Sequence, residues 1–181
     1  MTASHVALIR GINVGGKNIV PMATLRSALT AAGFDDVRTY IQSGNAVVTA
    51  PAMSEAAVAA RVEEVLEAEF DVHTVVVAVS DARLREVVHK APKGFGTEPE
   101  TYHYDVCFLH SSVASSDAVA AFALREGVDA VWEGDSAVYF RRLSARRTES
   151  RLSSVMGRPV YKHMTIRNWR TTTKLLEMLN G

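Results

Sequence analysis

The residues that could do chemistry most directly form a glycine-rich segment near the start of the chain, Arg10 to Asn18, with the sequence RGINVGGKN. The phosphate-binding loop of nucleotide hydrolases has Gly, any four residues, Gly, Lys and then Ser or Thr. Gly11, Gly16 and Lys17 satisfy this template, but Asn18 stands where a hydroxyl would hold Mg²⁺. The segment therefore argues against nucleotide hydrolysis.

Two interpretations of this segment remain. Amides of successive glycines can point into one concavity, and Arg10 and Lys17 would add the positive charge that suits an anion. Alternatively, Gly15 and Gly16 only allow positive φ in a turn that Asn13 caps. The local sequence slightly favours the turn.

Other reactive side chains form no recognisable catalytic or metal-binding pattern. The six histidines are scattered without a short His/Cys or His-Glu-x-x-His cluster, so we expect no metal and no cofactor. Ser43 lacks the Gly-x-Ser-x-Gly elbow of a serine nucleophile. Cys107 lies in the apolar run Val106–Leu109 and is interpreted as a core residue. The residues assign no reaction, and whether the protein is an enzyme stays open.

Elements that could position these residues alternate along the first half of the chain. Hydrophobic periodicity and turn signals predict strands and helices in the order β-α-β-β-α-β, followed by a connecting helix. The expected strands are 5–12, 37–42, 46–50 and 74–79, and the expected helices are 21–33, one that begins after the N-cap Ser54, and 81–89. This order is typical of the ferredoxin-like arrangement with an antiparallel sheet.

A second series follows a linker rich in Pro and Gly. It repeats the order β-α-β-β-α-β and adds a C-terminal helix. The expected strands are 102–109, 128–132, 137–141 and 159–162, and the expected helices are 116–126, 148–157 and 169–179. We therefore predict an α+β protein with two ferredoxin-like halves and mainly antiparallel sheets. The first half covers 1–91, the linker 92–100, and the second half with the extra helix 101–181.

Charge is distributed unevenly along a chain whose formal net charge is zero. Residues 1–140 carry 10 Lys/Arg and 18 Asp/Glu, whereas residues 141–181 carry 10 Lys/Arg and only 2 Asp/Glu. The basic tail could lie across the acidic part of the chain, or it could attract phosphate-bearing partners. Aromatic residues, among them Tyr161 and Trp169, lie between its arginines, a pattern that suits single-stranded nucleic acid.

Three segments resemble a known protein family. They are Arg10–Asn18 with Val20–Met22, Val37–Asn45, and Thr165–Trp169 ahead of Thr173–Leu176. In these segments the chain is similar to the bacterial family of domain of unknown function 1697. The resemblance implies a compact α+β protein with ferredoxin-like halves, and it carries no catalytic residues. Family members usually have Asn after the tryptophan, where this chain has Arg170.

The resemblance suggests where a ligand would bind, because its segments include a loop, a hairpin turn and a helix start. We expect these to line one polar cleft if the two ends of the chain meet. Its predicted residues are Arg10, Asn13, Gly15, Gly16, Lys17, Asn18, Ser43, Asn45, Arg167 and Asn168. The alternative is that the polar side chains only support turns and a helix cap.

These observations predict a cytoplasmic protein that binds a small anionic or phosphorylated ligand. A single cysteine excludes an internal disulfide, no secretory signal opens the chain, and no apolar run approaches the about 20 residues of a membrane helix. The alternative function is nucleic-acid binding by the basic C-terminal surface. Exposed sheet edges could also pair into a dimer, and the sequence leaves the oligomeric state open.

Overall fold

The computed structural model describes residues 2–181. The described residues up to Leu84, together with Leu175–Gly181, form one compact unit, and Arg85–Lys174 form a second. The boundaries between the units fall inside two helices, α3 (Asp81–His89) and α5 (Trp169–Asn180). The division predicted from the sequence, with a linker at 92–100, stays a prediction.

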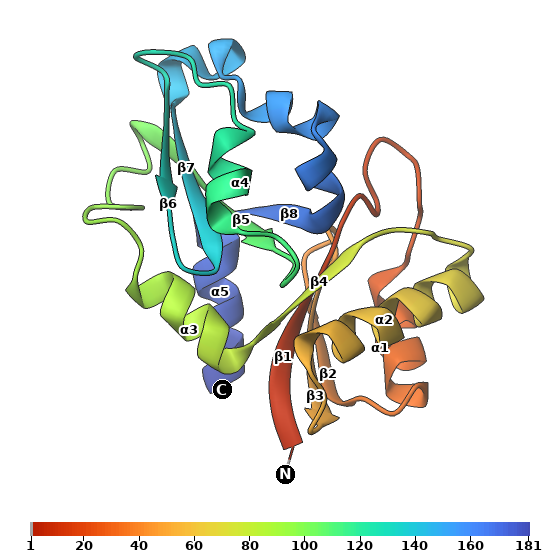
Figure 1. Cartoon of the computed structure of the whole chain (residues 1–181). Coiled ribbons are helices and arrows are strands. Elements are labelled where there is room, and N and C mark those ends of the chain that lie inside the picture. Colours follow the sequence, from red (N-terminus) through yellow and green to blue (C-terminus); the bar gives the residue numbers. More distant parts are fainter. Residues whose placement is uncertain (1) are drawn as a thin grey trace. The chain divides into compact units, whose positions relative to one another are not determined.

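The first unit is built on a four-stranded antiparallel sheet with the order β2-β3-β1-β4 (Figure 1). Its strands are β1 (Thr2–Ile9), β2 (Asp35–Tyr40), β3 (Asn45–Pro51) and β4 (Val76–Ser80). Helix α1 (Met22–Ala31) follows β1, and α2 (Glu55–Phe70) follows β3. The element order is therefore β-α-β-β-α-β, as the sequence predicts.

One face of this sheet packs against α1 and α2 (Figure 1). Side chains two apart on a strand and four apart on a helix share a face, which explains the composition of the core. Its buried members include Ala7, Ile9, Ala46, Val48 and Ala78 from the sheet and Leu25, Leu29, Val58, Val62 and Leu66 from the helices. The predicted cap of α2 is confirmed, because Oγ of Ser54 accepts a hydrogen bond from N–H of Ala57 at 3.2 Å.

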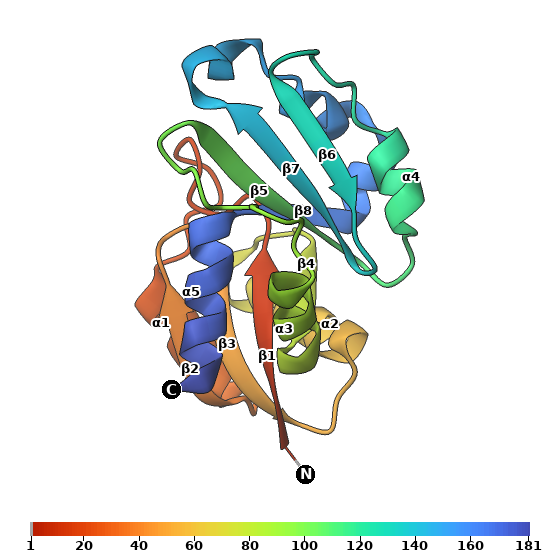
Figure 2. The same cartoon turned by 90° about the vertical axis from the view of Figure 1, so that its left-hand side faces the viewer.

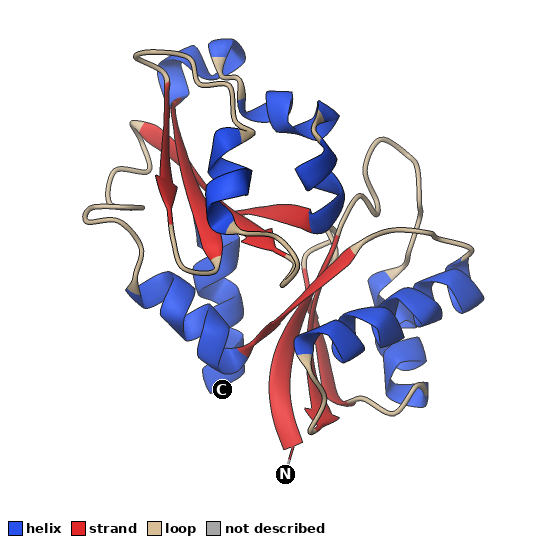
Figure 3. Ribbon diagram, in the orientation of Figure 1, coloured by secondary structure: helices blue, strands red, loops and turns tan. Residues whose placement is uncertain are grey.

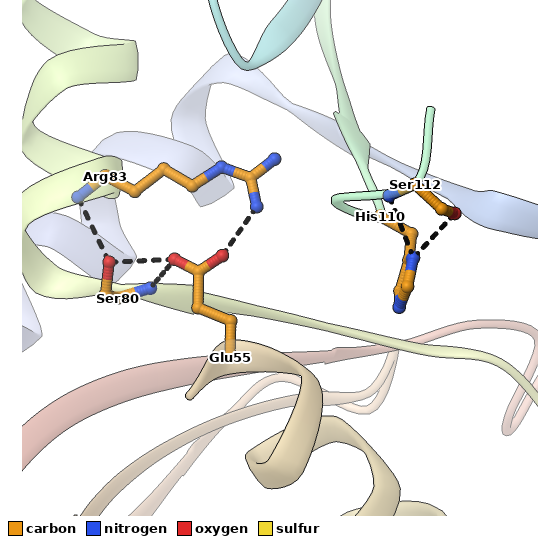
Figure 4. Close-up of polar contacts among 5 residues, drawn as sticks. All are labelled: Glu55, Ser80, Arg83, His110 and Ser112. Carbon is orange, nitrogen blue, oxygen red and sulfur yellow. Dashed lines mark hydrogen bonds and ion pairs between the residues drawn. The ribbon is translucent and has the colours of Figure 1, made fainter. Parts of the chain in front are cut away.

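A cluster of polar side chains connects the start of α2 to the end of β4 through hydrogen bonds (Figure 4). Oε1 of Glu55 accepts hydrogen bonds from N–H and Oγ of Ser80, both at 2.8 Å, and Oε2 pairs with Nη1 of Arg83 at 2.8 Å. Burial raises the pKa of Glu55, but the hydrogen bonds from Ser80 and the charge of Arg83 outweigh it and hold the pKa below its ordinary value. The cluster therefore favours ionised Glu55 in the folded state.

The second unit contains another four-stranded antiparallel sheet, with the order β6-β7-β5-β8 (Figure 2). Its strands are β5 (Tyr102–Leu109), β6 (Asp129–Glu133), β7 (Ala137–Leu143) and β8 (Met164–Asn168). The short helix α4 (Ser115–Ala120) packs on one face of this sheet. The two antiparallel sheets and the C-terminal helix confirm the predicted α+β class.

Cys107 lies in the core between this sheet and the segments that cover it. It is fully buried beside Val138 and Phe140 of the sheet and Ala118 of α4. Burial raises the pKa of its thiol far above the ordinary value, so the thiolate does not form near neutral pH. The predicted core role of Cys107 is confirmed.

The segment between β7 and β8 differs from the sequence prediction. Short 3₁₀ turns replace the expected helix 148–157, and the expected strand 159–162 is also a 3₁₀ turn (Figure 3). These turns are η1 (Ser144–Glu149), η2 (Leu152–Gly157) and η3 (Pro159–His163). Pro159 removes a backbone donor, and serine and glycine are weak helix formers, so no long helix or paired strand forms here. The fourth strand of this sheet is instead β8, which follows η3 in the chain.

The expected helix 116–126 is also shorter than predicted, because α4 ends at Ala120. Phe122 turns into the core with only 8% of its surface exposed. Beyond it, Oδ2 of Asp129 accepts hydrogen bonds from N–H of Arg125 and Arg151, both at 2.9 Å. This carboxylate satisfies the N–H of Arg125, which a continued helix would have paired internally, and it also binds the N–H of Arg151 in a later segment.

Candidate functional site

The glycine-rich segment of the first unit folds back on itself as a tight hairpin. Val14 and Lys17 form an antiparallel bridge in which N–H of Lys17 donates to the carbonyl of Val14 at 3.1 Å. Gly15 and Gly16 occupy the turn with φ of 60° and 72°. Glycine adopts this left-handed conformation at the least cost. The positive φ predicted for the two glycines is confirmed.

Two asparagines hold the shape of this hairpin. Nδ2 of Asn13 donates to the carbonyls of Val20 and Gln42, both at 2.9 Å, and Oδ1 accepts from N–H of Val20 at 2.8 Å. Nδ2 of Asn18 donates to the carbonyl of Gly11 at 3.1 Å. The loop is thereby fixed to the turn between β2 and β3. Both side chains support the backbone, as the turn interpretation requires.

The surroundings of the hairpin differ from those of a nucleotide-hydrolysing loop. Such a loop lies between a strand of a parallel sheet and a helix that starts at its lysine. Here both neighbours of β1 are antiparallel, and α1 begins only at Met22, after Pro21. Lys17 therefore does not stand at the start of a helix whose N–H groups could bind a phosphate together with it.

The turn between β2 and β3 contains the predicted residues Ser43 and Asn45. Nδ2 of Asn45 donates to the carbonyl of Tyr40 at 3.1 Å and lies 3.3 Å from Oγ of Ser43. Gly44 has φ of 86°, and a Cβ at this position would lie 2.7 Å from the carbonyl oxygen of Ile9. The turn therefore requires glycine at position 44 and uses Asn45 to hold its backbone.

The predicted residues Arg167 and Asn168 lie in the second unit, at the end of β8. Nη1 of Arg167 donates to Oγ1 of Thr165 and to the carbonyl of Ile166, both at 2.9 Å. Burial lowers the pKa of Arg167 to about 10, so the guanidinium is still charged at neutral pH. Oδ1 of Asn168 accepts from N–H of Thr171 at 2.7 Å and caps α5.

The predicted site residues thus fall into two groups, one in each unit. The contact between Asn13 and Gln42 brings the glycine hairpin and the following turn together in the first unit. Arg167 and Asn168 belong to the second unit. A single cleft that combines both groups stays a prediction.

The second unit also contains a cavity where β8 ends and α5 begins. Strand β8 pairs with β5 only as far as Asn168, which lies opposite Asp105. Residues 102–104 of β5 extend beyond this last pair. The cavity has a volume of about 740 Å³, within the usual range for a small-molecule site. It is lined by Gly96, Pro99, Tyr102, His103, Tyr104, Asp105, Arg142, Asn168, Trp169, Arg170 and Thr173.

Three lining residues carry buried polar atoms with incomplete hydrogen bonding. Within residues 2–181, no hydrogen-bond partner contacts the hydroxyl of Tyr104, Oδ2 of Asp105 or Nε of Arg142. Oδ2 of Asp105 does lie 3.3 Å from Nη2 of Arg142, so the two charges attract each other. Burial raises the pKa of Asp105 above its ordinary value, and the charges of Arg142 and His103 only partly oppose this effect.

Aromatic rings form another part of the cavity wall. Phe95 makes edge-to-face contacts with Tyr104 and Trp169, at centroid distances of 4.9 Å and 5.1 Å. A Cβ on Gly96 would lie 2.2 Å from Nε1 of Trp169, so the backbone of Gly96 lies directly against the indole. Trp169 is half-buried. The indole is therefore held in place by the protein while part of it faces the surroundings.

Basic side chains complete the lining. Nδ1 of His103 lies 2.8 Å from Oγ of Ser144, and Nε2 lies 3.4 Å from Nη1 of Arg147. A guanidinium can only donate, so in the neutral form of His103 Nε2 accepts from Arg147 and the proton lies on Nδ1. Arg170 is exposed in the first turn of α5. The cavity therefore offers hydrogen-bond donors of positive charge next to one carboxyl group.

A comparison with known families identifies the family of the chain. A family model described as protein of unknown function DUF1697 matches residues 1–139. The chain belongs to this family. The segment Thr165–Trp169, which shares the resemblance noted in the sequence, lies outside the matched residues.

A solved structure is similar to this DUF1697 chain over nearly its whole length. It is the conserved bacterial protein SP0830 from Streptococcus pneumoniae, which is 25% identical and superposes with a TM-score of 0.83 over 99% of each chain. A comparison with curated proteins gave no match.

The cavity was not predicted as a site from the sequence, although it includes the predicted residue Asn168. Its lining comes from separate parts of the chain that only the fold of the second unit brings together. One signal was available: Asp105 is an acidic residue in the otherwise apolar half of the strand YHYDVCFL. A carboxyl group in a buried strand is costly and so marks a position with a special role.

Several arginines of the basic tail already make contacts within the second unit. Arg146 pairs with Glu149 through two hydrogen bonds of 2.8 Å and 2.6 Å, and Arg125 lies 3.7 Å from the same carboxylate. The guanidinium of Arg141 lies 4.1 Å from the ring centroid of Tyr102. Arg141 therefore combines positive charge with an aromatic surface, whereas the charge of Arg146 is partly neutralised by Glu149.

Neither a metal-binding cluster nor a membrane-spanning helix is found among the described residues. Within residues 2–181, no group of three or more His, Cys, Asp or Glu side chains is arranged to hold a metal ion. None of the helices in the described part of the chain has the length and apolarity needed to cross a membrane.

Proposed function

We propose that this protein binds a small anionic ligand in the cavity at the start of α5. The observation that carries the proposal is that three residues lining the cavity, Tyr104, Asp105 and Arg142, each have a buried polar atom without a hydrogen-bond partner within residues 2–181. A buried polar group without a partner costs about 1 to 3 kcal/mol. Native proteins keep such groups where a ligand, an ion or a reaction uses them.

The charges around the cavity favour an anion. Arg142 and Arg170 contribute two positive charges to the lining, against one carboxyl group on Asp105. The N-terminus of α5 adds its positive dipole next to Arg170. Phosphate groups bind well at such helix starts, so a phosphorylated ligand suits the cavity. We place this activity in the cytoplasm and regard each half of the chain as ferredoxin-like.

Binding of phosphorylated probes tests this proposal. We would titrate the full chain with ribose 5-phosphate and adenosine monophosphate by calorimetry. Arg170→Ala should weaken binding about tenfold or more, because it removes a charge-assisted contact. Arg158→Ala is the matched control, since Arg158 is also exposed and does not line the cavity. Equal effects of the two substitutions, or no binding of any phosphorylated probe, would contradict the proposal.

The glycine hairpin is a second place proposed for an anion. Lys17 is exposed next to two glycines in the left-handed conformation, and successive amides of this kind can form an anion-binding nest. If the hairpin contributes to the site, Lys17→Ala weakens phosphate binding as Arg170→Ala does. If only the cavity binds, Lys17→Ala leaves the affinity unchanged.

Nucleic-acid binding by the basic C-terminal surface is the alternative function. Arg141 lies over Tyr102 and 5.4 Å from the ring centroid of Trp132, a combination that can hold stacked bases and phosphates. A short single-stranded oligonucleotide would then bind with an affinity that falls steeply with salt concentration. Salt-independent or undetectable binding would exclude this alternative.

A further inference from the structure

The lining of the cavity contains a carboxyl group and a guanidinium group side by side. Asp105 and Arg142 come from the neighbouring strands β5 and β7, with Oδ2 and Nη2 separated by 3.3 Å. The side chain of Asp105 is 9% exposed and that of Arg142 is 24% exposed. Both residues line the cavity and expose part of their side chains, while Oδ2 of Asp105 and Nε of Arg142 themselves are buried. A carboxylate accepts hydrogen bonds and a guanidinium donates them.

This pair matches a ring edge on which N–H donors lie next to a carbonyl acceptor. The carboxylate of Asp105 would accept from two adjacent N–H groups, while Arg142 would donate to the carbonyl oxygen. Guanine has this edge, because its carbonyl, ring N–H and exocyclic amine follow one another. Adenine has an amine in place of the carbonyl, and hypoxanthine lacks the exocyclic amine.

The aromatic part of the lining matches the face of the same ring. Trp169 is held by Gly96 and Phe95 and is half-buried, and Tyr102 is half-buried as well. Nucleobases stack on such rings, and each stacked base contributes about 1 to 3 kcal/mol. A flat ligand therefore gains more from this wall than a sugar phosphate alone would.

The third part of the lining matches a phosphate. Arg170 lies in the first turn of α5, next to Asn168, which caps the helix through N–H of Thr171. Asn168, Arg170 and Asp105 line the same cavity. A ligand with a base at one end and a phosphate at the other could contact both the polar pair and the helix start.

We propose that the ligand of this cavity is a guanine mononucleotide, an assignment that rests on the proposed anion-binding function. The base is recognised by Asp105 and Arg142 and lies against Trp169. The phosphate binds Arg170 at the start of α5.

Three nucleotides that differ only at the base edge test the assignment on the unaltered protein. Guanosine monophosphate should bind about tenfold or more tightly than either inosine monophosphate or adenosine monophosphate. Inosine monophosphate lacks the exocyclic amine and so leaves one contact of the carboxylate unmade. Calorimetry on the full chain measures these affinities. Equal affinities for the three nucleotides, or a preference for adenine, would overturn the assignment.

A substitution at the carboxyl group provides the second test. Asp105→Asn should weaken guanosine monophosphate binding about tenfold and remove the preference over inosine monophosphate. Asp117→Asn is the control, because Asp117 is exposed in α4 and does not line the cavity. An unchanged preference in Asp105→Asn contradicts the assignment.

The two proposals fail in distinguishable ways. If ribose 5-phosphate and all three nucleotides bind with equal affinity and depend on Arg170, the anion-binding function stands and the guanine assignment is wrong. If no probe binds, both are wrong. Binding of guanosine monophosphate that is sensitive to both Asp105→Asn and Arg170→Ala supports both.

Discussion

The backbone of Gly96 lies directly against the indole of Trp169. Gly96 has φ of 83°, and a Cβ on it would lie 2.2 Å from Nε1 and 2.3 Å from Cδ1 of the ring. Phe95, the preceding residue, contacts the same indole edge-to-face. The loop before β5 therefore fixes one side of the cavity wall through two consecutive residues.

Replacing Gly96 should displace Trp169 and destabilise the second unit. Gly96→Ala adds a methyl group that overlaps the indole, and such overpacking costs about 1 to 3 kcal/mol beyond the backbone strain at positive φ. Gly94→Ala is a matched control, because Gly94 has φ of 78° but the atom nearest to its added Cβ, Oγ1 of Thr97, lies 3.8 Å away. Urea unfolding followed by tryptophan fluorescence measures both variants, and equal losses would show that the ring contact contributes nothing.

The carboxyl group of Asp105 should make stability depend on pH. Burial raises its pKa in the folded state, so above about pH 4 the folded protein binds more protons than the unfolded chain. The free energy of unfolding therefore falls as the pH rises through this range. Asp105→Asn removes the titration, and the variant should gain stability relative to the unaltered protein with increasing pH.

Urea unfolding at a series of pH values between about 4 and 8 measures this difference. Each tenfold change in proton affinity corresponds to about 1.4 kcal/mol. The charge of Arg142 already acts on the folded-state pKa of Asp105, so the ion pair is part of this pH dependence. Asp117→Asn, at an exposed position, is the control substitution. A constant difference between Asp105→Asn and the unaltered protein would contradict the expectation.

Local sequence signals predicted the first unit well. Ser54 caps α2 as expected, and the apolar residues of α2 face the sheet at helical spacing. The error between β7 and β8 has a local cause as well. Val160 and Tyr161 suggested a strand, but they follow Pro159, and the neighbouring residues form 3₁₀ turns. Weak periodicity in a short segment does not distinguish these states.

The cavity could not be predicted in the same way, because it depends on contacts between distant segments. Asp105 and Arg142 are far apart in the chain and become neighbours only through the pairing of β5 with β7. The glycine-rich segment drew attention because its motif is local. Its asparagines proved to hold the loop, which is a role that their sequence pattern supports equally.

The glycine hairpin offers a test that separates structural from ligand-binding residues. Asn13→Ala removes three hydrogen bonds that fix the loop, so it should lower the free energy of unfolding by about 1 to 3 kcal/mol. Lys17→Ala changes an exposed side chain and should change stability by less than about 0.5 kcal/mol. Thermal and urea unfolding measure both. A stable Asn13→Ala variant would mean that these hydrogen bonds contribute little to the fold.

The cluster around Glu55 should stabilise the first unit in a pH-dependent manner. Glu55→Ala removes the acceptor of two hydrogen bonds from Ser80 and the partner of Arg83, so we expect a loss of about 1 to 3 kcal/mol at pH 7. Because the folded-state pKa of Glu55 lies below its ordinary value, this stabilisation is present above about pH 4.3 and is lost as the pH falls through the lowered pKa.

Urea unfolding at neutral and acidic pH measures the contribution of Glu55. Glu64→Ala is the control, since Glu64 pairs with Arg61 on the surface of the same helix, with 64% and 46% of the side chains exposed. Exposed pairs of this kind contribute at most about 1 kcal/mol. The difference between the two variants should therefore be largest at neutral pH and should shrink on acidification, because protonation removes the charge that Ser80 and Arg83 stabilise. A difference that stays constant down to about pH 2 would assign the effect of Glu55 to helix packing instead of charge.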